Sequence, residues 1–235
     1  IPNPTPTTPS ILRPAVPAKD RLAHWTSSFA LSNRSLSIPA ADRQRRFDII
    51  LSSLDEKTRS NYGAGLIRFH DFCDSRNISE STRMPASDEL LATFIASWAG
   101  ERSDSTLRTW LSGLHFWHTA NGALWLEGPQ CAAVMKGAKK IVPVTSRRPK
   151  RAPVTPNHLV ILRQNLVLSN TFDAAVYGVA CTAFWGICRL GELVPPSENA
   201  FIPSKHVSRA CGHKSSTTNN GGAYETFVVP RTKTS

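Results

Sequence analysis

Cysteine, acidic residues and long apolar runs are all scarce in this chain of 235 residues, and each shortage excludes a class of protein. The five cysteines are odd in number and form no Cys-x-x-Cys pair, which argues against a disulfide framework and a zinc ribbon. The longest mostly apolar run, residues 174–188, is shorter than the ~20 residues that a bilayer crossing needs. We therefore expect a nuclear or otherwise intracellular protein in which residues 174–188 form a buried core helix.

The shortage of acidic residues leaves a strong positive charge. Asp and Glu total 17 against 28 Lys and Arg, which gives a formal net charge of +11. Residues 146–152 hold four basic and no acidic residues, whereas residues 39–145 hold thirteen and twelve. A clustered excess of this kind predicts contact with a polyanion such as nucleic acid or an acidic membrane.

Composition divides the chain into four segments. Six prolines among the first twenty residues, with few large apolar side chains, predict a disordered Pro/Thr-rich arm over 1–38. Helical apolar spacing predicts a helical domain over 39–142. Proline-flanked basic residues predict a linker over 143–153, followed by a second domain over 154–235. Because the first residue is Ile1, we expect the chain to be an excerpt at its N-terminus.

Local signals place the secondary structure within these segments. Five helices are predicted in the first domain, over 42–54, 56–76, 88–98, 103–120 and 129–140. The second domain is predicted to begin with helices over 155–168 and 172–194. A strand over 224–229 follows a turn at 219–222 and pairs either back across that turn or with a segment beyond the C-terminus.

Two short motifs follow the basic linker. They are Gly186-Ile-Cys-Arg189-Leu-Gly-Glu192-Leu193 and Arg231-Thr232-Lys233-Thr234. Arg189 and Lys233 are 44 residues apart and follow the helical domain in order. In this order the chain resembles the tyrosine recombinases, or phage-integrase family, and looks most like the Crypton-type branch of fungal mobile elements. The resemblance covers about residues 40–235.

The resemblance implies both a fold and a reaction. The fold is mainly α, with a helical SAM-like core-binding domain followed by the start of an α catalytic domain that carries a small β-hairpin. Arg189 matches the first catalytic arginine, Glu192 the acidic neighbour on the same helix and Lys233 the hairpin lysine. The family transfers a DNA phosphate to a tyrosine without a metal or nucleotide cofactor, and guanidinium groups suit the charge that develops on that phosphate.

The later catalytic elements of the family have no counterpart here. A His-x-x-Arg, a further His or Trp and the nucleophilic tyrosine belong many tens of residues after the lysine, and only Thr234 and Ser235 follow it. His206-Val-Ser-Arg209 precedes Lys233, so we interpret it as a coincidence. We expect the chain as given to bind DNA without completing a strand exchange. The second hypothesis is that a longer parent chain is an active recombinase.

The expected partner is double-stranded DNA, with self-association on DNA left open and no membrane partner. Basic and hydroxyl side chains near two helix starts, a lysine run and the linker are candidates for phosphate contact, although solvated helix faces explain several of them almost as well. The candidate residues are Lys57, Arg59, Ser105, Thr106, Arg108, Thr109, Lys136, Lys139, Lys140, Arg147, Arg148, Lys150 and Arg151. The third hypothesis is a helical adaptor that binds protein or RNA through the linker.

Aromatic and metal-ligating residues allow two interpretations each. The tryptophans at helical spacing favour core packing over stacking on bases. His115 with His118, and Cys211 with His213, have no second ligand pair at zinc-site spacing, so we expect structural or surface roles and no metal. The four tryptophans are Trp98, Trp110, Trp117 and Trp125.

Overall fold

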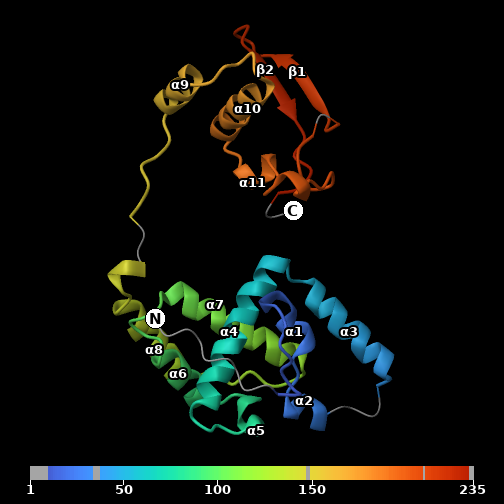
Figure 1. Ribbon diagram of the computed structural model, residues 1–235, viewed down its shortest axis with the longest axis vertical. Helices are drawn as coiled ribbons and strands as arrows, with labels where there is room; N and C mark the ends of the chain where they lie inside the picture. The colour runs from blue at the N-terminus through green and yellow to red at the C-terminus, as the bar shows by residue number, and fades with distance from the viewer. Residues whose placement is uncertain (1–9, 34–37, 147–148, 209, 233–235) are drawn as a thin grey trace. The chain divides into compact units, whose positions relative to one another are not determined.

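The computed structural model describes residues 10–33, 38–146, 149–208 and 210–232 (Figure 1). The chain divides into two compact units, Ile1–Pro149 and Lys150–Ser235, and the division falls within the expected linker. The described residues are mainly helical and include a two-stranded antiparallel sheet. No described helix is long and apolar enough to cross a membrane.

The five helices expected in the first unit are confirmed, with ends shifted by a few residues. Serine side chains cap two of them: Ser87 Oγ accepts the Leu90 N–H at 3.2 Å, and Ser103, predicted as the first residue of its helix, instead caps it, with Oγ accepting the Thr106 N–H at 3.3 Å. Gly122, with φ of +73°, lies in the left-handed region after the fourth of them. The elements are α3 Ala40–Ser52, α4 Glu56–Asp74, α5 Glu80–Arg83, α6 Asp88–Ala96, α7 Asp104–Ala120, α8 Pro129–Lys140 and the 3-10 helix η2 Val144–Ser146.

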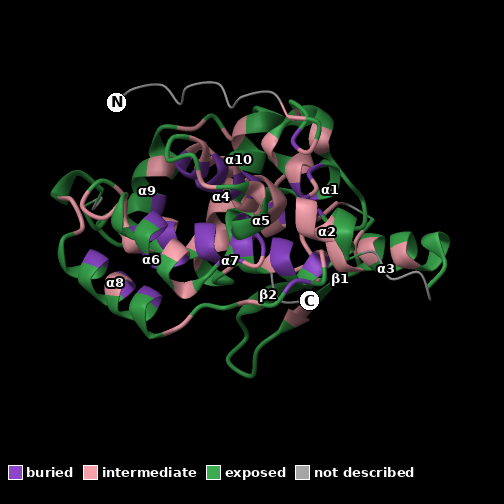
Figure 2. Cartoon of the chain, turned by 90° about the horizontal axis from the view of Figure 1, so that it is seen from below, coloured by how far each residue is buried: buried purple, intermediate pink, exposed green. Residues whose placement is uncertain are grey.

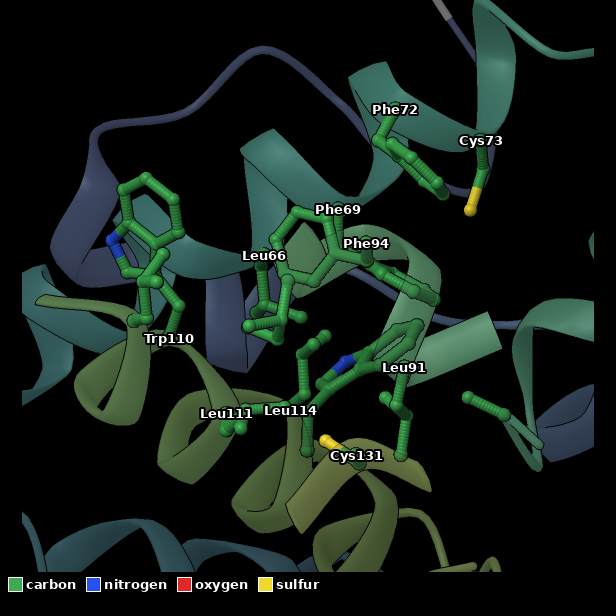
Figure 3. Close-up of a cluster of buried hydrophobic side chains, with 14 of the residues drawn as sticks. Leu66, Phe69, Phe72, Cys73, Leu91, Phe94, Trp110, Leu111, Leu114 and Cys131 are labelled. Atoms are coloured by element: carbon green, nitrogen blue, oxygen red, sulfur yellow. The ribbon is translucent and has the colours of Figure 1, made fainter. Parts of the chain in front are cut away.

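The core of the first unit forms where α4, α6 and α7 meet (Figure 3). Phe69, Phe94 and Trp117 are fully buried, and the Phe69 and Phe94 rings meet edge to face with centroids 5.4 Å apart. The four tryptophans lie within this core or pack against it, which confirms the packing interpretation. Apolar faces at helical spacing have thus been buried against one another.

The backbones of α4 and α7 touch at two glycines. A Cβ at Gly65 would lie 2.8 Å from the Cα of Trp110, and a Cβ at Gly113 would lie 2.9 Å from the Cα of Tyr62. Any larger residue at either position would push the helices apart. The glycines therefore set how closely α7 approaches α4.

The expectation of a disordered arm over 1–38 is wrong for residues 10–33, which pack on the first unit. Leu22 and Trp25 are 1% and 5% exposed, and the Trp25 Nε1–H donates to the Pro14 carbonyl at 2.9 Å. Burial of two large apolar side chains offsets the entropy of ordering, which the prolines have already reduced. The segment forms the 3-10 helix η1 Ala18–Asp20, α1 Arg21–His24 and α2 Ser28–Ser32.

A buried ion cluster also holds this segment. Arg13 pairs with Asp74 at 3.6 Å and with Glu80, while Arg83 pairs with the same two carboxylates at 2.7 Å and 3.3 Å. Both arginines are buried. Because a buried charge stripped of its partner destabilises a fold by about 3–5 kcal/mol, the cluster ties residues 10–33 to α4 and α5.

The described residues of the second unit form three helices, a 3-10 turn and a hairpin. The strand expected near residue 224 pairs back across the turn, in antiparallel register from His213 opposite Phe227 to Thr217 opposite Ala223. Gly221, with φ of +79°, permits the turn. The elements are α9 Pro156–Gln164, α10 Thr171–Trp185, α11 Leu190–Leu193, the 3-10 helix η3 Glu198–Ala200, β1 His213–Thr217 and β2 Ala223–Phe227.

Two expectations for this unit are wrong. The helix predicted over 172–194 breaks after Trp185, because Gly186 ends α10 and Ile187 adopts a φ of 52°. The run 174–188 is not a buried core helix either, since α10 contains no buried residue and its Phe172 and Trp185 are 73% and 70% exposed. α10 packs mainly against α9 and α11, whereas most buried residues lie in the first unit (Figure 2).

We expect the amide hydrogens of α10 to exchange faster than those of α4 and α7, by roughly tenfold or more. The physical reason is that opening α10 exposes little buried surface, whereas opening α4 or α7 disrupts the core. Hydrogen exchange followed by mass spectrometry measures this difference. Equal protection of the three helices would contradict it.

Candidate nucleic-acid interface

Three of the predicted DNA-contacting cations line one groove of about 530 Å³ between α7 and α8. Arg108 comes from α7, and Lys136 and Lys139 come from α8. Glu127 is the one carboxylate among the nine residues that line the described groove. The remaining lining residues are Leu111, Ser112, His115, Ala132 and Met135.

Helical periodicity explains how the two helices present these cations. On α7, Leu107, Leu111 and Leu114 are buried, so Arg108 and the other groove-lining polar residues fall on the exposed side. α8 likewise turns an apolar face inward and leaves Lys136, Lys139 and Lys140 exposed. None of these lysines forms an ion pair with a described residue, and Arg108 lies 3.9 Å from Asp104 on its own helix.

Asp88, the first residue of α6, fixes the start of α8. Its carboxylate accepts the backbone N–H groups of Gly128, Gln130 and Cys131 at 2.8, 2.9 and 3.0 Å. Partial burial of the carboxylate opposes ionisation, but these hydrogen bonds outweigh it and lower the pKa of Asp88. A negative charge at the N-terminus of α8 also complements the helix dipole.

Aromatic packing supports the wall of the groove. The Trp125 ring stacks on the His115 ring with centroids 5.0 Å apart, and its Nε1–H donates to Glu127 at 3.0 Å. His118 is buried, with Nε2 accepting the Ala86 N–H at 3.0 Å, and burial lowers its pKa to about 4. His115 and His118 thus pack in the structure, and the described residues include no group of three or more ligands suited to a metal ion.

The other α4 and α7 candidates lie outside the groove lining. Lys57 is exposed in the first turn of α4, and Arg59 is half-buried, with an Nε that has no hydrogen-bond partner among the described residues. The hydroxyls of Ser105 and Thr106 lie 3.0 and 2.8 Å from Ser103 Oγ. The Thr109 hydroxyl donates to the Ser105 carbonyl at 2.9 Å, so all three hydroxyls have local partners before any ligand binds.

The basic linker is only partly described. Lys150 and Arg151 are exposed, and the predicted contacts Arg147 and Arg148 lie outside the described residues. For the linker, the structure therefore shows only that two of these four cations are exposed.

Arg189 and Glu192 form the pair that the motif predicts, in a different local setting. Arg189 is the N-cap of the short α11 rather than part of a long helix, and its Nη1 donates to the Glu192 carboxylate at 3.0 Å. The Arg189 backbone N–H donates to the same carboxylate at 2.9 Å. The Arg189 side chain is 63% exposed and that of Glu192 14%, and Lys233 lies outside the described residues.

Two features of the first unit escaped sequence reasoning. Asp88 begins α6, and nothing in the sequence spacing linked it to the start of α8 some forty residues later. Arg21, Arg68 and Arg102 lie against tryptophans from separate segments. Only local spacing is visible in a sequence, so neither feature carried a signal.

Comparisons with known proteins yield no relative. No family model, no curated protein and no solved structure matches this chain.

We expect Asp88→Asn to lower the melting temperature of the first unit by a few degrees at neutral pH. The carboxylate is ionised above a pKa that folding depresses, so its stabilising effect is present above about pH 4 and is lost as the pH falls through the folded pKa. The difference between wild type and variant should shrink below that pH. Thermal melts from pH 3 to 7 measure it, with Glu89→Gln, on the exposed side of the same turn, as the matched control.

Proposed function

We propose that this protein binds double-stranded DNA through the groove between α7 and α8. The observation that carries the proposal is the convergence of Arg108, Lys136 and Lys139, from two different helices, on one groove. The side chains of the groove suit a phosphate backbone, because a planar guanidinium and two ammonium groups donate hydrogen bonds to phosphate oxygens. Their binding would release counterions and make affinity dependent on salt.

Neighbouring groups extend this surface. Lys140 continues the exposed lysines of α8, and Ser105 and Thr109 lie on the exposed side of the first turns of α7. Hydroxyls and cations of this kind contact phosphates and set the register of a protein on a duplex without reading bases. The proposal therefore covers backbone binding and assigns no base-specific contact.

The resemblance to tyrosine recombinases supports the same partner. On this resemblance, we propose that the first unit corresponds to the SAM-like core-binding domain and the second to the start of the catalytic domain. The exposed Arg189, held by Glu192, is compatible with a phosphate-binding role. We propose strand cleavage only for a longer chain that supplies the remaining catalytic groups.

Replacing both groove lysines, as Lys136→Gln with Lys139→Gln, should weaken binding to a fluorescent duplex. The slope of log affinity against log salt should become shallower by about 2, since each phosphate contact contributes about 0.9. Fluorescence anisotropy over a salt series measures both quantities. A matched control, Lys205→Gln with Lys214→Gln, removes the same charge from exposed positions in the other unit and should leave the slope nearly unchanged.

The same series discriminates the competing hypotheses. Equal slopes for the groove variant and its control would contradict the groove as the DNA site. Tighter binding to single-stranded RNA than to duplex DNA would favour the adaptor hypothesis. A third variant, with Arg147, Arg148, Lys150 and Arg151 changed to Gln, isolates the contribution of the linker.

A further inference from the structure

Three arginines on the first unit each lie over the ring of a different tryptophan. They come from three separate segments: Arg21 from α1, Arg68 from α4, and Arg102 from the connection between α6 and α7. All three are half-buried. From guanidinium carbon to ring centre, the distances are 5.6 Å for Arg21 over Trp25, 5.0 Å for Arg68 over Trp110 and 5.6 Å for Arg102 over Trp98.

The guanidinium groups lie near enough to interact electrostatically, Arg21 with Arg68 and Arg68 with Arg102. Arg21 Nη1 donates to the Gly63 carbonyl at 2.9 Å, and Arg68 Nη1 donates to the next carbonyl of α4, that of Ala64, at 2.8 Å. The Trp98 and Trp110 rings, with centroids 5.3 Å apart, bring Arg102 beside Arg68. We call Arg21, Arg68 and Arg102 the arginine row.

The positive charge of the arginine row is only partly balanced by the described residues. None of the three arginines forms an ion pair with a described carboxylate. Burial and then the neighbouring arginine lower the pKa of both Arg21 and Arg68, while Asp71 acts in the opposite direction. Asp71 is itself half-buried, and burial followed by the nearby Asp74 raises its pKa. Like charges thus interact with one another, and the Asp71 carboxylate interacts with two of them.

The free protein leaves further bonding capacity of the row unused. The Nε atoms of Arg21 and Arg102 are buried and have no hydrogen-bond partner in the part of the chain that the structure describes. Such groups destabilise the unliganded state, because a buried donor without an acceptor loses its bonds to water. An anion bound to the accessible N–H groups of the row would offset the repulsion between its like charges.

The arginine row lies apart from the groove on α7. Arg108 lines the groove, whereas Arg68 lies over the Trp110 ring. Residues two apart on an α-helix are rotated by about 200°, so they point to nearly opposite sides. The core packing of Trp110 against Phe94 and Trp98 fixes this orientation. Cations therefore flank the exposed side of α7 on both edges.

We propose that the arginine row is a second anion site, which binds phosphoryl oxygens. A guanidinium offers several N–H donors in one plane, and stacking on an indole holds that plane in a fixed orientation. Three neighbouring guanidinium groups suit an anion with several phosphoryl oxygens or a run of adjacent phosphates. The source is either a nucleic-acid backbone or a free polyphosphate compound, and both present the same oxygens.

The test uses inorganic pyrophosphate and a fluorescent DNA duplex as separate probes of the full chain. Arg68→Gln and Arg102→Gln should each lower the affinity for the probe that the row binds by about tenfold, which is the effect of losing one charged hydrogen bond. The matched control is Arg76→Gln, which removes the same charge from an exposed arginine stacked on Phe72 just beyond α4. Calorimetry measures pyrophosphate binding and anisotropy measures duplex binding.

Each outcome decides a point. Row-dependent binding of pyrophosphate identifies a site for small phosphate compounds, and row-dependent binding of the duplex alone identifies a backbone contact. The proposal is overturned if the row variants bind both probes as tightly as Arg76→Gln does, which would leave the arginines as covers for the tryptophans. Thermal melts show whether the Arg68→Gln variant is folded. Because Arg102 lies in the connection between α6 and α7, the Arg102→Gln variant repeats the test without changing a helix. The groove variant at Lys136 and Lys139 tests the groove independently.

Discussion

The close contact between α4 and α7 is the constraint on which the rest of the first unit depends. Gly65 and Gly113 let the two backbones meet, and the large rings of the core then fill the space around the crossing. Because the contact determines which side of α7 faces inward, it also determines where its polar residues go. Arg108 faces α8 while Trp110 faces α4, so a single helix serves both the groove and the arginine row.

Burial differs sharply between the two units, and the contacts that hold their arginine side chains differ accordingly. The first unit has enough buried surface to hold arginines against tryptophans and to anchor Arg13 and Arg83 in an ion cluster. The second unit buries few side chains and holds Arg189 through one neighbouring carboxylate. Fixed placement of arginines against aromatic rings, on which the arginine row depends, is therefore a property of the first unit.

Local features of the fold were predictable from the sequence, and features set by distant contacts were not. The helix starts at Ser87 and Ser103 and the hairpin turn at Gly221 depend on neighbouring residues, so they were found. The packing of residues 10–33 depends on Trp25 reaching a core assembled from α4 and later helices, which composition cannot show. The break after Trp185 was missed because apolar spacing continues across Gly186.

The sequence by itself determined the excess of basic residues, the amphipathic helices and the Arg189–Glu192 spacing. It also indicated the three lysines and arginines that line the proposed groove. Only the tertiary structure decided which of them meet: Arg108 lines the groove with the α8 lysines, whereas Lys57 and Arg59 do not. It also placed Arg21, Arg68 and Arg102 against tryptophan rings, which the sequence did not predict. The reason is physical, since helical periodicity relates residues within one element, whereas proximity between elements arises from packing.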